Sequence, residues 1–144
     1  MLKVLSILGV VVMIGALVGL YKIGVLFTAQ PIAIAVQLLA VALMVSARVT
    51  FGRRSFHAAA NPTAGGLVTT GPYRIIRHPI YTAACLFGWS AIVVHWSLVS
   101  VALGILLLLG ALVRMVCEEQ LVKQKYPEYV EYAKVTKRMV PHLF

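Results

Sequence analysis

Acidic residues are scarce in this chain of 144 residues. It has only four, all glutamates, against thirteen lysines and arginines, so the formal net charge is +9. Charged residues of both signs make up 12% of the chain, about half the ~25% usual in soluble domains, while 61% of the residues are hydrophobic. The length fits one domain, and the composition excludes an ordinary soluble one.

The basic charge excludes a second class of protein. Nucleic-acid binders carry their lysines and arginines on the water-exposed faces of soluble folds. Here these residues stand just outside long apolar runs, where they would meet anionic lipid headgroups. We therefore expect membrane lipids as partners and no nucleic acid.

Cysteine is also rare. Cys85 and Cys117 fall within or at the end of apolar segments, with no Cys-x-x-Cys pair and no histidine at ligand spacing. We expect two buried free thiols rather than a disulfide or a metal pair, so no metal site is predicted.

Long runs without charge dominate the rest of the sequence. Residues 4–21 form an ~27 Å helix, enough to span a bilayer, and we expect a span rather than a signal peptide because no small-x-small cleavage site follows. Pro31 suits the first turn of a second span over 31–47. A single helix over the uncharged residues 79–113 would be ~52 Å long, too long for one crossing.

This last run must fold back, and His95-Trp96-Ser97 is the expected turn because Trp and His suit the headgroup level. The spans are then about 80–95 and 97–116. Beyond them, residues 118–144 are amphipathic, with a helix start at Pro127. The sequence therefore predicts an all-α integral membrane protein with about four transmembrane helices. The last two form a tight helical hairpin, and an interfacial helix follows at the C-terminus.

The lysines and arginines outside these spans indicate the orientation. Eleven of the twelve lie on the side of the N-terminus, the 48–79 loop and the C-terminal segment, and Lys22 alone lies on the other. By the positive-inside rule this side faces the cytoplasm, and we expect a prokaryotic inner membrane.

Two polar clusters lie on that side. The first is the stretch TTGPYRIIRHPIY over residues 69–81, and the second contains Arg114 and Glu118, which share one helix face at i, i+4 spacing. Ionisable residues near membrane depth are functional candidates by default. The alternative is structural: a snorkelling arginine with an ion pair, and topogenic arginines beside an interfacial tyrosine. We expect the two clusters to meet.

The pattern also carries a resemblance. Gly71-Pro72-Tyr73-Arg74-x-x-Arg77-His78-Pro79-x-Tyr81 is followed by Glu118-Glu119 and then by tyrosines at 126, 129 and 132. This pattern, over roughly residues 65–141, resembles the isoprenylcysteine carboxyl methyltransferase family. It is also similar to phospholipid N-methyltransferases of the endoplasmic-reticulum type.

The resemblance implies an enzyme that uses S-adenosylmethionine, releases S-adenosylhomocysteine and methylates a lipophilic small molecule or lipidated acceptor. Arg114 would hold the acceptor and Glu118 a polar or cationic part of the cofactor, as the two catalytic residues. Glu119 would complete the pocket or pair with Lys123. The implied cofactor-binding residues are Gly71, Tyr73, Arg77, His78, Pro79, Tyr81, Glu118 and Glu119.

Residues 1–144 then form a single membrane domain, with two spans over 1–47 and the cofactor-binding loop, hairpin and C-terminal segment over 48–144. A carboxylate acceptor would suit Arg114, whereas a strongly basic mouth would repel an ammonium. The alternatives are methylation of a phospholipid or another amine, an NADPH-dependent reductase of the sterol type, and a non-catalytic lipid-binding membrane protein. The chain is shorter than the eukaryotic carboxyl methyltransferases.

Overall fold

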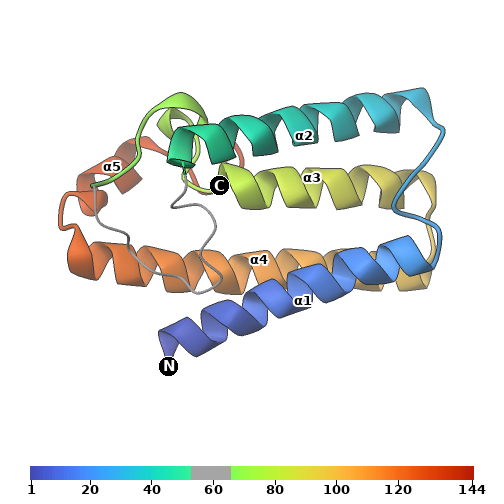
Figure 1. Ribbon diagram of the computed structural model, residues 1–144, viewed down its shortest axis with the longest axis horizontal. Coiled ribbons are helices and arrows are strands. Elements are labelled where there is room, and N and C mark those ends of the chain that lie inside the picture. The colour runs from blue at the N-terminus through green and yellow to red at the C-terminus, as the bar shows by residue number, and fades with distance from the viewer. Residues whose placement is uncertain (53–65) are drawn as a thin grey trace.

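Four long helices run up and down along one axis in the computed structural model, which describes residues 1–52 and 66–144 (Figure 1). They are α1 (Leu2–Lys22), α2 (Pro31–Phe51), α3 (Pro79–Val94) and α4 (Leu98–Lys125). A 3₁₀ turn, η2 (Gly71–Arg74), precedes α3, and the short α5 (Tyr129–Val135) follows α4. The all-α prediction is confirmed. The bases Arg53 and Arg54 and most of the breaker-rich part of the 48–79 loop lie outside the described residues.

The long helices have the character of membrane spans. Among the described residues, α1, α2 and α4 are long and apolar enough to cross a bilayer, with mean hydropathy of 2.2 to 2.5. In each of these helices, at most 39% of the apolar 18-residue stretch is buried in the protein. Their outer faces are therefore apolar and require lipid as solvent. The 16-residue α3 is apolar as well but shorter, about 24 Å. The chain is an all-α integral membrane protein.

The hairpin between α3 and α4 turns at the predicted residues. α3 ends at Val94, and Ser97 caps α4 by accepting a hydrogen bond from the backbone N–H of Ser100 at 3.0 Å. In return, the Ser97 backbone N–H donates to the Ser100 hydroxyl at 2.9 Å, which completes a capping box. The reversal is therefore fixed by local hydrogen bonds.

The helices associate mainly as two pairs, α1 with α4 and α2 with α3 (Figure 1). The first pair makes backbone contact: a Cβ added at Gly9 would lie 2.8 Å from the Gly110 carbonyl oxygen, and one added at Gly110 would lie 2.7 Å from the Gly9 oxygen. Small residues at this crossing allow the close approach that membrane helices use for packing.

The last long helix extends beyond the predicted span. α4 runs to Lys125, whereas the span was expected to end at about 116, and Glu118 lies on the same helix as Arg114, as their spacing predicted. Glutamate, glutamine and lysine are good helix formers, and loss of apolarity ends a span but not a helix. The expected helix near Pro127 is confirmed as α5, which is only seven residues long.

After α5 the chain returns to the start of α3. Ile76 and Lys137 form an isolated parallel bridge. The backbone N–H of Arg77 donates to the Lys137 carbonyl at 2.7 Å, and that of His78 donates to the Arg138 carbonyl at 2.9 Å. The C-terminal segment is thereby fastened to the central loop.

Candidate active site

The central loop reaches the N-terminal end of α3 through a glycine turn and a proline start. Gly71 has a φ of +56°, and a Cβ there would lie 2.7 Å from the Thr50 hydroxyl oxygen, so both conformation and space favour glycine. Pro79 begins α3, where its missing N–H is not needed. This entry directs His78 and Tyr81 toward α4.

Tyr81, Arg114 and Glu118 form one cluster, which we call the Glu118 cluster. The Tyr81 hydroxyl donates to Glu118 Oε1 at 2.6 Å, and Arg114 Nε donates to the same oxygen and to the Tyr81 hydroxyl oxygen, both at 2.8 Å. Arg114 is 5% exposed, whereas the Glu118 side chain is 24% exposed. The expected meeting of the two polar clusters is confirmed, and Glu118 is more exposed than Arg114.

A second carboxylate, Glu119, is buried among positive charges. It accepts from Arg77 Nε at 3.2 Å and from Arg138 Nη2 at 3.0 Å, and it lies 3.2 Å from His78 Nε2. We call these four residues the Glu119 cluster. The alternative pairing with Lys123 does not form. A carboxylate that is 4% exposed requires such partners, because burying an isolated charge is costly.

His78 connects the two clusters. Its Nε2 faces Glu119, while its Nδ1 lies 3.9 Å from Glu118 Oε2. The imidazole is 8% exposed, and its ring centroid lies 5.7 Å from that of Tyr81. A shift of His78 would therefore be felt by both glutamates.

Arg77 fastens the C-terminal segment as well as Glu119. Its Nη1 donates to the carbonyl oxygens of Ala133, at 3.0 Å, and of Thr136. Its guanidinium therefore bridges α4, α5 and the residue after α5.

Three tyrosines that are buried or half-buried lie near the clusters. Burial raises the pKa of Tyr132 to about 12, and its hydroxyl donates to the Tyr73 carbonyl oxygen at 2.6 Å. Burial and then the charge of Glu118 raise the pKa of Tyr73, and burial and then Glu119 raise that of Tyr129. All three phenols are therefore neutral near pH 7, and Tyr73 lies within electrostatic reach of Glu118.

The structure thus brings together most of the residues that the sequence singled out. Two lie at the margin: Gly71 is exposed at the start of η2, and Pro79 is buried under the helix start. The assignment of any of these residues to a cofactor pocket stays a prediction. The residues that the structure gathers are Tyr73, Arg77, His78, Tyr81, Arg114, Glu118 and Glu119.

Two residues that bind to the predicted ones were not predicted from the sequence. Arg138, in the C-terminal segment, binds Glu119. Ser6, a polar residue inside the first apolar run, accepts from Arg114 Nη1 through its hydroxyl oxygen at 2.9 Å. The signal available for Ser6 was its polarity alone, which does not reveal the register between α1 and α4.

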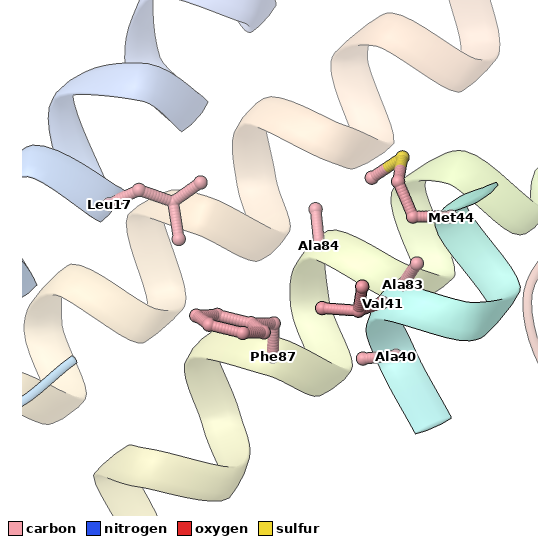
Figure 2. Close-up of a pocket in the computed structure, with 7 residues that line it drawn as sticks. All are labelled: Leu17, Ala40, Val41, Met44, Ala83, Ala84 and Phe87. Carbon is pink, nitrogen blue, oxygen red and sulfur yellow. The ribbon is translucent and has the colours of Figure 1, made fainter. Parts of the chain in front are cut away.

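An apolar cavity of about 190 Å³ lies between α1, α2 and α3 (Figure 2). Alanines from two helices and the larger side chains of Met44 and Phe87 surround it (Figure 2). A cavity of ~150 Å³ with an apolar lining holds a benzene molecule, so this one accommodates about six to eight carbon atoms of a chain. It is lined by Leu17, Ala40, Val41, Met44, Ala83, Ala84 and Phe87.

Comparison with known proteins adds the family. Residues 31–129 match the sequence model of the family described as phospholipid methyltransferase. The chain is also 35% identical, over 80 residues, to the nickel-cobalt-cadmium resistance protein NccN of Alcaligenes xylosoxydans xylosoxydans and to the cobalt-zinc-cadmium resistance protein CzcN of Cupriavidus metallidurans. These matches cover 54% of this chain but only 37% and 36% of the relatives. No solved structure matches the chain significantly.

The names of these relatives refer to metals. In the described part of this chain, no group of three or more His, Cys, Asp or Glu residues lies close enough together to hold a metal ion.

Proposed function

Because the chain belongs to the phospholipid methyltransferase family, we propose that this membrane protein transfers a methyl group from S-adenosylmethionine to a lipophilic acceptor. The observation that carries the proposal is the convergence of Tyr81 and Arg114 on Glu118 at the inner end of α3. It combines a fixed, partly exposed carboxylate with an adjacent apolar cavity, as a polar donor and a lipid acceptor would require.

The residues present fit the proposed cofactor. The Glu118 carboxylate is 24% exposed and can accept hydrogen bonds from an ammonium group or from ribose hydroxyls. The neutral phenols of Tyr73 and Tyr81 add hydroxyl and aromatic surface beside it. When bound, S-adenosylmethionine supplies an electrophilic methyl group on a sulfonium, which an in-line nucleophile displaces.

The protein's own contribution is then alignment and exclusion of water. We assign Glu118 to holding the cofactor and Arg77, His78 and Glu119 to the wall behind it, because these three side chains already pair with one another. Oriented attack inside a dry site can lower the barrier by ~7–11 kcal/mol without a general base. This route suits an acceptor that is already an anion.

The lipophilic part of the acceptor has a place in the apolar cavity. Ala84 is three residues, or about 4.5 Å along the axis of α3, from Tyr81. An acceptor with its chain against Ala84 and Phe87 therefore has its head near the Glu118 cluster.

A carboxylate is the acceptor group that we propose. The two clusters contain three arginines and two glutamates, an excess of positive charge that attracts an anion and repels an ammonium. Arg114 can bind a carboxylate through parallel hydrogen bonds when the acceptor replaces Glu118 or the Tyr81 hydroxyl on its guanidinium. An amine acceptor is the second candidate, because the matched family is described by phospholipid methylation.

One experiment separates these acceptors. The purified chain in lipid nanodiscs is given methyl-labelled S-adenosylmethionine and either a long-chain lipid carboxylate or a long-chain lipid amine. We expect label in a product that releases methanol in mild base, which is the behaviour of a methyl ester. Base-stable label would identify an N-methylated product, and no transfer together with no S-adenosylhomocysteine binding would refute the proposal.

We propose that the active site faces the cytoplasm. The N-terminus, the start of α3 and the end of α4 lie at the same end of the bundle (Figure 1), and the chain's bases concentrate in the segments at that end. A reporter fused to the C-terminus should be active in the cytoplasm, and one that is active on the opposite side would reverse the orientation.

A further inference from the structure

The first helix makes direct contact with the Glu118 cluster. Arg114 Nη1 donates to the Ser6 hydroxyl oxygen at 2.9 Å and lies 3.4 Å from the Ser6 carbonyl oxygen. Ser6 is fully buried, at 0% exposure, and is 108 positions from Arg114 in the chain. It also precedes residue 31, where the match to the family begins.

Close packing of α1 on α4 produces this contact. Gly9 and Gly110 touch through their backbones, and Ser6 and Arg114 lie one turn away along each helix toward the inner end. With a side chain at either glycine, the helices would have to separate, because each added Cβ would meet a carbonyl oxygen at less than 3.0 Å. The position of Ser6 therefore depends on the two glycines.

The contact constrains the orientation of a planar group. Arg114 Nε donates hydrogen bonds to Tyr81 of α3 and Glu118 of α4, and Nη1 donates one to Ser6 of α1. Two edges of the guanidinium are therefore fixed from different helices. A guanidinium presents its donors in a rigid fork, and fixing two edges determines where the remaining donors point. Without the Ser6 hydroxyl, the Nη1 edge of the guanidinium would lose the hydrogen bond that α1 supplies to it.

We infer that Ser6 is a positioning residue that orients Arg114 toward the acceptor, so that α1 is part of the catalytic unit. The inference rests on the proposed function, because it assigns Arg114 to the acceptor. Ser6 acts through Arg114 and does not itself touch the reacting atoms.

The test uses Ser6→Ala and Ser6→Cys in the 144-residue chain in nanodiscs. Both remove the hydroxyl oxygen, and the cysteine nearly preserves its volume. We expect kcat/KM for the acceptor to fall roughly tenfold or more, the effect of losing one hydrogen bond to a charged group, while the Kd for S-adenosylhomocysteine stays unchanged. Ser90→Ala is the matched control, because Ser90 bonds only within its own helix, to the Phe87 carbonyl oxygen at 2.9 Å, and it should leave both quantities unchanged.

A double-mutant cycle separates positioning from packing. In an Arg114→Lys background, Ser6→Ala should cause little further loss, because the group it orients is gone. Gly9→Ala should reproduce the loss of Ser6→Ala by separating α1 from α4. Gly15→Ala, where an added Cβ meets nothing within 4 Å, should not.

Three outcomes overturn the inference. Unchanged kcat/KM in Ser6→Ala would show that Arg114 needs no partner from α1. Equal losses in kcat/KM and in S-adenosylhomocysteine binding would indicate a packing role. In both cases an active wild-type chain leaves the proposed function standing, whereas a wild-type chain that neither binds S-adenosylhomocysteine nor transfers methyl refutes both.

Discussion

The hydroxyl of Tyr81 donates a 2.6 Å hydrogen bond to Glu118, although the two residues are 37 positions apart in the chain. The bond joins the first turn of α3 to the C-terminal half of α4. Arg114 Nε donates to the Tyr81 hydroxyl oxygen and to the same Glu118 oxygen, so the three side chains form a closed set of hydrogen bonds. A carboxylate held by two donors has one orientation, and the Glu118 side chain is still 24% exposed. This arrangement makes Glu118 the residue whose replacement is most informative.

Glu118→Gln should weaken binding of S-adenosylhomocysteine by at least about tenfold. The amide keeps the shape but removes the charge that accepts from Arg114 and from the proposed ligand, and hydrogen bonds to charged groups contribute about 1.5–3 kcal/mol. Isothermal titration in nanodiscs measures the Kd. Glu128→Gln, on an exposed glutamate of the C-terminal segment, is the control. Equal affinity in wild type and Glu118→Gln would remove Glu118 from the cofactor site.

Glu119→Gln should act on stability first. The buried carboxylate neutralises Arg77 and Arg138, and removing one partner of a buried ion pair costs about 3–5 kcal/mol. We expect a lower Tm and faster tryptic cleavage after Lys137 in the C-terminal segment. Glu131→Gln is the matched control, because its pair with Lys134 is 64–73% exposed and such pairs contribute about 0–1 kcal/mol. A Tm equal to that of the control would contradict the scaffold role.

Ala84→Leu should alter which acceptor chains are used. The larger side chain fills part of the cavity beside Phe87, and one methylene in an apolar pocket changes specificity by about tenfold or more. We expect kcat/KM to fall for long-chain acceptors and to fall less for short ones. Ala42→Leu adds the same volume on the exposed face of α2. The same chain-length profile in both variants would mean that the cavity holds bulk lipid only.

The stability of the C-terminal segment should decrease in strong alkali. The pKa of Tyr132 is raised from 10.0 to about 12, because burial disfavours its phenolate. The contribution of the neutral Tyr132 phenol to the stability of the folded state is fully present below pH 10 and is lost as the pH rises through about 12. The free energy of unfolding is measured between pH 9 and 12, about the range set by the ordinary and the raised pKa of Tyr132. It should fall more steeply with pH in wild type than in Tyr132→Phe. Parallel declines would show that Tyr132 has the same pKa in the folded and the unfolded protein.

The sequence predicted the spans well because charge decides where a span can lie. Lys3 and Lys22 bound the first apolar run, and α1 covers Leu2–Lys22. Pro31 begins α2 as expected, and Ser97 caps the return helix. Apolar length and proline position are local properties, so they can be read without knowing the partner helices.

The meeting of the two polar clusters was also predictable. Arg114 and Glu118 stand at the end of a span on the side where residues 69–81 emerge, and charges at that depth need partners. The partner of each charge was not predictable. Glu119 had two expected roles, completing the pocket or pairing with Lys123, and neither named its partners, which come from the central loop and from the C-terminal segment.

The contribution of Ser6 could not be predicted for a related reason. A serine in an apolar run carries no helix-to-helix register, and one residue of slippage between α1 and α4 would turn its hydroxyl away from Arg114. Contact of Gly9 with Gly110 fixes that register, and glycines are too common in membrane helices for this pair to be singled out.

The brevity of α3 bears on where this protein can work. Its 16 residues extend about 24 Å, less than the ~30 Å of a typical hydrocarbon core. A bilayer adapts to such hydrophobic mismatch by thinning around the short helix, at a small cost for each ångström. Tyr81 in the first turn of α3 would then lie where the leaflet dips, so the thickness of the host membrane becomes a determinant of access to the site.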